Sequence, residues 1–116
     1  MLEEKTLAVV TRHGEAMASK DPDIILKDYA EDAVVLCTLS DKPAVGHAQI
    51  RELIVKVLAM DLFAEGNGSQ ILYQKAVGER ALHVFTNKPA ITYGAETYIV
   101  RDDKIVFESA AIVLAE

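Results

Sequence analysis

The stretch DYAEDAVVLCT, residues 28–38, decides the fold because it passes from a helical pattern into a strand without glycine or proline. Tyr29 is amphipathic and can pack beneath a sheet, whereas Glu31-Asp32 is a pair of poor strand formers that favours a solvated turn. We therefore predict a strand over residues 33–39, which starts only after the two acidic residues. Near its far end this strand carries Cys37, the one cysteine of the chain.

Helical patterns flank this strand on both sides. Residues 3–20 carry apolar side chains at helical spacing with charged residues between them, which predicts a first helix. Asp21-Pro22, an N-cap residue followed by proline, predicts a short second helix from residue 22 to about residue 29. A third helix is predicted from near residue 48 to about residue 60, because Ile50 and later apolar residues share one face.

The rest of the chain is mainly extended. A flexible loop is predicted at residues 65–69, and the reversal at residues 101–104 joins the last two strands as a hairpin. Helices gathered first and strands last predict an α+β fold, with the helices on one face of an antiparallel sheet. The four predicted strands after the loop cover residues 70–77, 80–87, 90–101 and 104–114.

Length, charge and cysteine count limit the function classes. A chain of 116 residues fits one domain, residues 1–116. The formal net charge of -6 argues against nucleic-acid binding. A single cysteine, no secretory pattern and no long apolar run lead us to expect a cytoplasmic protein without a membrane segment. Three histidines on separate elements make no metal motif, so no metal is expected.

The order of elements, together with Tyr29-Ala30-Glu31-Asp32-Ala33 and Gly46-His47-Ala48-Gln49-Ile50, resembles the nuclear transport factor 2-like superfamily. That superfamily includes SnoaL-like proteins and ketosteroid isomerases, and the resemblance covers nearly the whole chain. It implies a cystatin-like α+β fold, in which a cone-shaped, curved, mostly antiparallel sheet packs against three helices from the N-terminal half. The helices then close the cone over an apolar pocket.

The resemblance also implies positions for site residues. The isomerases have an aspartate base after the first strand, where this sequence has Cys37-Thr38, so a base of that type is missing. The tyrosine that donates a hydrogen bond from the first helix of the isomerases aligns with His13. Their protonated carboxylic acid falls near Glu96. The Asp-Arg-Asp arrangement of the superfamily's epoxide hydrolases cannot be placed on these strands.

Glu96 lies in an apolar segment, where an ionised carboxylate is costly unless it is paired. On strict alternation it shares a face with Tyr98, Gly94 and Thr92. Periodicity does not say which face is inward, so Glu96 either lines a pocket or lies at the surface. In the pocket, Glu96 and His13 are the candidate catalytic acid/base pair, because burial raises the pKa of a glutamate and histidine titrates near neutral pH.

Cys37 and His13 each allow two interpretations. A small thiol on an apolar strand is commonly core filler, whereas a Cys-His pair can form a nucleophile. His13 lies with Met17 on the apolar stripe of its helix, so it is either a hydrogen-bonded core residue or an acid/base group. We expect Cys37, Tyr98 and Met17 to contact a ligand in the pocket.

The other face of the predicted sheet is also apolar. Residues 105–115 are apolar on both alternating faces over most of their length, unlike a strand with one wet face. We therefore expect a twofold homodimer through the sheet, which the resemblance also implies. The alternative is that the C-terminal strand is central in the sheet and covered by loops. The preceding strand adds four apolar residues opposite Glu96, namely Ile91, Tyr93, Ala95 and Ile99.

Three hypotheses for function follow from these observations. The first is a small enzyme that acts on a small apolar ligand by proton transfer without a cofactor, as an isomerase, cyclase or lyase. The second is a non-catalytic domain that binds a hydrophobic ligand. The third is an interaction module whose functional surface is the dimeric face of the sheet. Fold cannot choose among them, because one scaffold can carry many functions.

Overall fold

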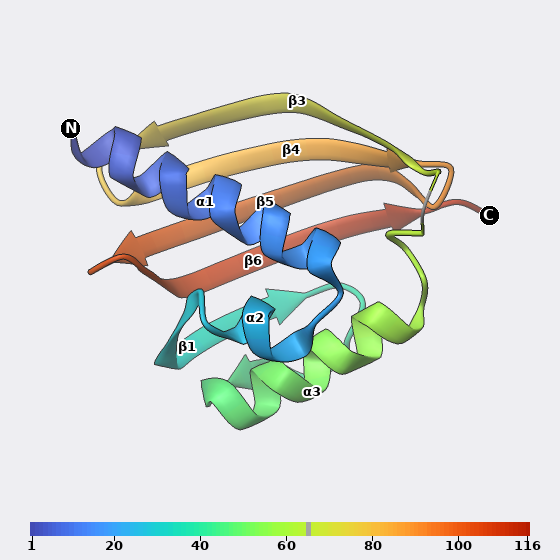
Figure 1. Cartoon of the computed structure of the whole chain (residues 1–116), viewed down its shortest axis with the longest axis horizontal. Helices are drawn as coiled ribbons and strands as arrows, with labels where there is room; N and C mark the ends of the chain where they lie inside the picture. The colour runs from blue at the N-terminus through green and yellow to red at the C-terminus, as the bar shows by residue number, and fades with distance from the viewer. Residues whose placement is uncertain (65) are drawn as a thin grey trace.

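The computed structural model describes residues 1–64 and 66–116, so Glu65, in the predicted loop, lies outside the described residues. The described part of the chain contains three helices and one six-stranded sheet (Figure 1). The elements are α1 Leu2–Ser19, α2 Pro22–Leu26, β1 Tyr29–Cys37, β2 Ala44–Val45, α3 Gly46–Ala59, β3 Gly68–Val77, β4 Arg80–Lys88, β5 Ile91–Arg101 and β6 Lys104–Leu114.

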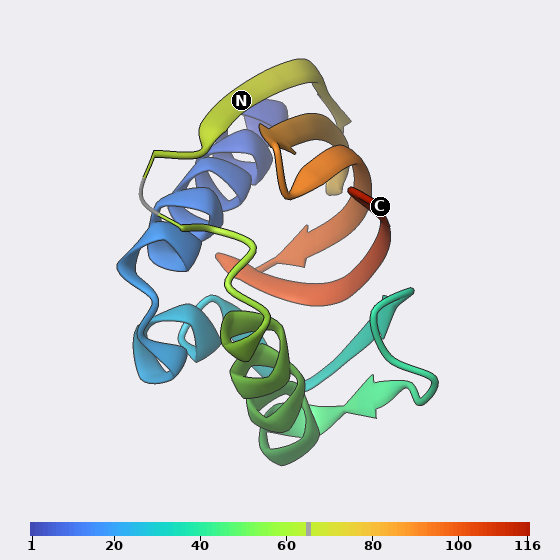
Figure 2. The same cartoon turned by 90° about the vertical axis from the view of Figure 1, so that its right-hand side faces the viewer.

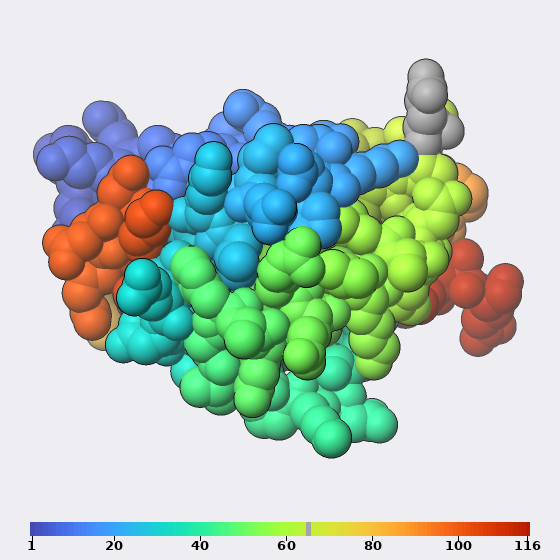
Figure 3. All heavy atoms as spheres, turned by 60° about the horizontal axis from the view of Figure 1, so that its bottom comes forward, coloured from blue at the N-terminus to red at the C-terminus, as the bar shows by residue number. Residues whose placement is uncertain are grey.

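The sheet is mixed, with strand order β2-β1-β6-β5-β4-β3. Strands β3 to β6 form an antiparallel meander, and β1 pairs with β6 in parallel. Helix α1 packs on β3, β4 and β5, whereas α3 packs on β1 and β2. Figure 2 shows the sheet curling around the side on which the helices lie, and α2 and α3 lie side by side on that helical face (Figure 3). The α+β class and the position of the helices on one face are confirmed.

The meander and its last turn agree closely with the sequence prediction. The β5–β6 hairpin closes with Arg101 opposite Lys104. Its two turn residues, Asp102 and Asp103, have φ of 52° and 64°. Aspartate tolerates this left-handed conformation better than most residues do, and paired positive φ values suit the twist of a tight hairpin.

The start of β1 differs from the prediction. The second helix ends at Leu26 instead of near Tyr29, and the strand begins at Tyr29 instead of Ala33. Tyr29 already pairs with Ile105 of β6, and the register shifts before regular pairing resumes at Val34. The exposed acidic pair therefore lies within an irregular part of the strand, because a bulge can hold residues that do not fit a regular ladder.

The connection from β1 to α3 contains a short strand that sequence analysis missed. β1 ends at Cys37, and the chain returns as β2, which pairs with β1. Gly46 follows with φ of 82°, a conformation that favours glycine, so α3 begins before the predicted start at Ala48. Ile50 is 0% exposed and anchors the helix in the core.

Strand β5 contains an irregularity that strict alternation does not predict. The register shifts between Ile91 and Tyr93. Thr92 is consequently exposed and does not share the inner face with Glu96. Ile91 is 1% exposed and lines the interior, so its assignment to the outer face was wrong. A bulge reverses the facing of the residues on one side of it.

Gly94 of β5 lies directly against the ring of Phe85 in β4. A Cβ at Gly94 would come within 2.5 Å of Phe85 Cε1. We therefore expect Gly94→Ala to lower the free energy of unfolding by about 1–3 kcal/mol, measured by urea denaturation. Gly14→Ala is the matched control, because nothing lies within 4 Å of its Cβ. It should leave stability unchanged or raise it by about 0.5–1 kcal/mol. Equal effects of the two substitutions would contradict this close approach.

Candidate functional site

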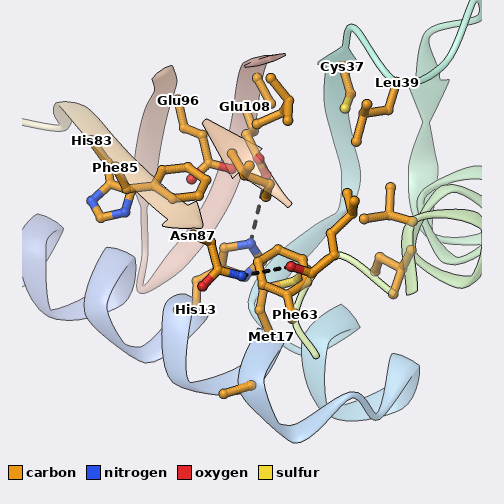
Figure 4. Close-up of a pocket in the computed structure, with 18 of the residues that line it drawn as sticks. His13, Met17, Cys37, Leu39, Phe63, His83, Phe85, Asn87, Glu96 and Glu108 are labelled. Atoms are coloured by element: carbon orange, nitrogen blue, oxygen red, sulfur yellow. Dashed lines mark hydrogen bonds and ion pairs between the residues drawn. The ribbon is translucent and has the colours of Figure 1, made fainter. Parts of the chain in front are cut away.

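A cavity of about 300 Å³ lies between the concave face of the sheet, α1, α3 and the segment after α3 (Figure 4). Its walls are mainly aliphatic and aromatic, and a few polar groups converge on it, which is typical of a small-molecule site. The polar and titratable side chains that line it are His13, Tyr29, Cys37, Asn67, Ser69, His83, Asn87, Glu96, Tyr98 and Glu108.

The five residues that the sequence singled out all line this cavity. They are His13, Met17, Cys37, Glu96 and Tyr98, contributed by α1, β1 and β5. Glu96 therefore lies on the inner face of the sheet, the point that periodicity left open.

Glu96 and Tyr98 lie on the same face of β5 and interact. Tyr98 Oη donates a hydrogen bond of 2.9 Å to Glu96 Oε1. Burial, and next the negative charge of Glu108, raise the pKa of Glu96 to about 8. Glu96 consequently holds a proton at neutral pH. Burial also raises the pKa of Tyr98, so its hydroxyl stays protonated as well.

Glu108 is a residue of the site that sequence analysis missed. It is 5% exposed, and it pairs with Tyr98 across β5 and β6, so it is a diagonal neighbour of Glu96 on the inner face. Tyr29 Oη donates a hydrogen bond to Glu108 Oε1. One signal was present, because Glu108 interrupts an apolar strand and a buried carboxylate needs partners. Its partners, however, come from a distant part of the chain.

The hydrogen bonds around Tyr29 place a proton on His13 Nε2. Tyr29 has one hydroxyl proton, which goes to Glu108, so His13 Nε2 donates to Tyr29 Oη across 3.2 Å. His13 Nδ1 lies 3.4 Å from Asp28 Oδ2, an ion-pair contact whose geometry falls short of a hydrogen bond. Burial alone would lower the pKa of His13, but Asp28 and Glu108 raise it above its ordinary value. Both ring nitrogens are thus directed at protein groups.

Asp28 supports His13 from the side away from the cavity, and sequence analysis missed this role too. It is 4% exposed, and Arg12 Nε donates a hydrogen bond of 2.7 Å to its Oδ1. Arg12 also contacts Asp103, with 3.1 Å between Nη1 and Oδ2. Burial raises the pKa of Asp28, but the contacts with His13 and Arg12 lower it below its usual range. A chain of charged groups therefore runs from the surface to the cavity wall.

The thiol and the other two histidines have less reactive surroundings. Burial raises the pKa of the Cys37 thiol, which is the opposite of activation. His83 contacts Gln74, with 2.8 Å between Nδ1 and Oε1, and burial lowers the pKa of His83. His47 Nε2 lies 2.8 Å from the carbonyl oxygen of Tyr29 and braces α3 against β1. The raised pKa of the thiol and the contacts of the two histidines favour the interpretation of Cys37 as a residue that lines the cavity. They do not favour a Cys-His nucleophile.

Residues 1–64 and 66–116 contain no group of three or more His, Cys, Asp or Glu side chains that could hold a metal ion. In the same residues, no lysine or arginine lines the cavity. The Asp-Arg-Asp arrangement of the epoxide hydrolases therefore has no counterpart in the described cavity wall. None of the described helices has the length and apolar character needed to cross a membrane.

The arrangement of helices and sheet matches many solved structures. An NTF2-like protein of unknown function from Mesorhizobium loti has a TM-score of 0.74 at 17% identity, over 97% of this chain and 94% of that chain. A SnoaL-like protein of unknown function from Burkholderia thailandensis has a TM-score of 0.76 at 14% identity, over 95% of each chain. The chain has the nuclear transport factor 2-like fold.

The same fold occurs in a putative ketosteroid isomerase from Kribbella flavida, with a TM-score of 0.72 at 14% identity, over 98% of this chain and 82% of that chain. No protein-family model matches the sequence, and no curated protein is significantly similar to it. Identities this low establish the nuclear transport factor 2-like fold alone, so the function must be argued from the cavity.

Asp28→Asn removes the negative charge that holds His13 in its protonated form. Because Asp28 raises the pKa of His13 against the effect of burial, we expect the pKa of His13 to fall in this variant. The stabilisation from protonated His13 is present at low pH and is lost as pH rises through its folded pKa, so the loss of stability is largest below that pKa. NMR titration of the histidine ring protons measures the shift.

Asp103→Asn is the control for this titration, because Asp103 contacts the same Arg12 from an exposed position. It should change the pKa of His13 by no more than a few tenths of a unit, as expected for screened surface charges. An unchanged His13 pKa in Asp28→Asn would contradict the ion pair.

Proposed function

We propose that this chain binds an apolar small molecule in the cavity and catalyses proton transfer on it without a cofactor, as an isomerase, cyclase or lyase. One observation carries the proposal: the partly buried carboxyl of Glu96 and the buried carboxyl of Glu108 lie together on one wall of an apolar cavity. Glu96 holds a proton, whereas Glu108 accepts a hydrogen bond and faces a protonated histidine. Neighbouring groups in different protonation states can serve as an acid and a base.

In the proposed reaction, the Glu96 O–H donates a hydrogen bond to a substrate oxygen while the Glu108 carboxylate takes a proton from a nearby carbon. The electrons of the broken C–H bond move into the carbon–carbon bond, and negative charge develops on the oxygen. Glu96 stabilises that charge inside a cavity with mainly apolar walls. Return of the proton from Glu108 to another carbon completes an isomerisation and restores both carboxyls.

His13 acts through Tyr29 in this proposal. Its Nε2 lies 3.9 Å from Glu108 Oε1, and Tyr29 fixes the orientation of that carboxylate. His13 is therefore a positioning residue, whereas the sequence-based hypothesis treated it as the acid/base partner of Glu96. Cys37, Met17 and Tyr98 are proposed to contact the ligand.

A non-catalytic hydrophobic-ligand-binding domain is the second candidate function. Cys37 favours this alternative. It occupies the position where the resemblance implies a catalytic base in the isomerases, and a thiol with a raised pKa is a poor replacement for that base. In this alternative the two carboxyls only orient the ligand.

Thermal unfolding with a panel of steroids, polyketide-like aromatics, terpenoids and fatty acids tests whether the cavity binds ligands. A bound ligand at about 100 times its dissociation constant should add roughly 2.7 kcal/mol, or several degrees of Tm. Cys37→Phe places a large ring in the cavity and should abolish the shift, whereas Cys37→Ala keeps the cavity open and should retain it. If no compound shifts Tm, the proposal that the cavity binds these classes is wrong.

Turnover of the ligand class that binds then separates the two candidate functions. Removal of the acid in Glu96→Gln should lower kcat/KM by about 10²–10⁴-fold while the variant still binds the ligand. Glu31→Gln removes a carboxylate from the surface and should leave the rate unchanged. Binding without turnover by the unmodified chain would favour the non-catalytic alternative.

We also propose that the chain forms a homodimer through the convex face of the sheet. Strand β6 lies between β1 and β5, so it is central in the sheet. Val113 on its outer face is nevertheless 53% exposed, so this face is not covered by loops at that residue. Contiguous apolar patches are uncommon on monomers. The patch includes Leu36, Val45, Leu82, Tyr93 and Val113, each 39–54% exposed.

Val113→Lys places a charge on this proposed interface and should convert the dimer to a monomer, because an unpaired charge is costly to bury. Sedimentation velocity measures the change in mass. Val55→Lys is the control, since Val55 is also 44% exposed but lies on α3, on the helical side. A monomeric unmodified chain, or dissociation by both substitutions alike, would refute the interface.

A further inference from the structure

The charges behind and within the cavity wall nearly balance. Arg12 and His13 are cations, and Asp28 and Glu108 are their anionic partners, with contacts of 2.7 Å, 3.4 Å and 3.9 Å along the chain. Glu96 is the fifth group. If it were ionised, one buried negative charge would remain without a partner, and for this reason Glu96 keeps its proton.

The described residues leave no cation to neutralise that charge. None of the lysines or arginines lines the cavity, and both nitrogens of His13 already face Tyr29 and Asp28. The pKa of His83 is lowered by burial and by the charge of His13, so this ring is neutral. Only a proton or a cation that enters from outside can balance an ionised Glu96.

The remaining proton lies where two carboxyls meet. Tyr98 occupies Oε1 of Glu96, and Tyr29 occupies Oε1 of Glu108. Their Oε2 atoms receive no side-chain hydrogen bond from elsewhere in the described chain, and both residues line the cavity (Figure 4). Two adjacent carboxyls commonly share a single proton, because both cannot ionise at close range.

The rest of the cavity wall suits an organic cation. Phe63, Phe85 and Tyr98 line it, and the face of an aromatic ring attracts positive charge. Aliphatic residues such as Leu53 and Val57 complete the wall and can pack against alkyl groups. An anionic ligand would instead meet two carboxyls and no free cation.

We propose that the cavity is also a proton-exchange site for hydrophobic ammonium ions. Such an ion seats beside Glu96 and Glu108 with its apolar groups against the aromatic wall, and the proton of Glu96 leaves as the ion enters. Binding of the ion also blocks the proposed reaction, because the acid that this reaction needs has lost its proton. The inference rests on the proposed function in one respect, that a small molecule enters the cavity.

The pH dependence of binding identifies this exchange. Release of one proton makes the affinity rise about tenfold per pH unit below the pKa of Glu96, about 8, and level off above it. A quaternary ammonium probe cannot lose a proton itself, so any slope belongs to the protein. The titratable or charged groups around Glu96, from every element of the cavity wall, are His13 and, behind it, Asp28, together with Tyr29, Cys37, His83, Tyr98 and Glu108.

The experiment compares phenyltrimethylammonium with tert-butylbenzene, its neutral carbon isostere, between pH 6 and pH 9. We expect the cation to bind with the stated slope, and the isostere to bind with an affinity that changes little with pH. Both probes meet the same titrating histidines, so the difference between them isolates the exchange. Calorimetry of the cation in two buffers of different ionisation enthalpy should give about one proton released at pH 7.

Glu96→Gln keeps the shape of the side chain and removes the exchangeable proton. It should abolish the pH slope and weaken binding of the cation at pH 8 by about tenfold or more, with little change for the isostere. Glu31→Gln, the same substitution at an exposed position, should behave like the unmodified chain. The comparison of the two probes on the unmodified chain stands even if Glu96→Gln fails to fold.

The outcomes separate this inference from the proposed function. If the isostere binds and the cation does not, or if the cation binds with no pH slope, proton exchange is refuted and the small-molecule cavity stands. If neither probe binds, proton exchange is refuted, and the proposed function is decided by the thermal-unfolding panel of larger apolar ligands.

Discussion

The hydroxyl of Tyr29 is the contact on which the rest of the cavity depends. It accepts from His13 on α1 and donates to Glu108 on β6, so one side chain of β1 joins three elements that are distant in sequence. A buried ion without partners is very costly, so each of these groups requires the other two. Asp28, the residue before Tyr29, completes the arrangement by facing the other nitrogen of His13. The stretch of residues 28–38 thus supplies both residues that contact the ring nitrogens of His13.

This arrangement explains why two carboxyls can lie together inside a small domain. Replacing a buried ion pair by apolar residues is often neutral or stabilising, so buried charge is weak evidence for a purely structural role. A carboxyl whose pKa is raised to about 8 in a cavity is more typical of a functional site. Burial and the neighbouring Glu108 favour the neutral form of Glu96. Its sensitivity to protons and to cations follows from that constraint.

Sequence reasoning succeeded where local pattern decides structure and failed where partners are distant. The meander and α1 follow from alternation and helical periodicity, and the hairpin follows from its turn residues. The register shifts near Tyr29 and Ile91 are set by pairing with β6. The periodicity of a short stretch of sequence carries no information about such pairing. Glu108 was missed because its partner Tyr29 lies 79 residues away. Glu96 was found because the resemblance pointed to its position.

One sheet serves the cavity and the proposed dimer face through the alternation of its strands. Glu108 faces the cavity, and the next residue outward, Ser109, pairs with Thr97 on the convex side. A slip of one residue between β5 and β6 would exchange the two faces and expose the carboxyls. The position of Glu96 diagonally beside Glu108 is therefore set by the register of the same two strands. A second copy on the convex face would hold that register from outside, so loss of the dimer should loosen the carboxyl pair as well as the interface.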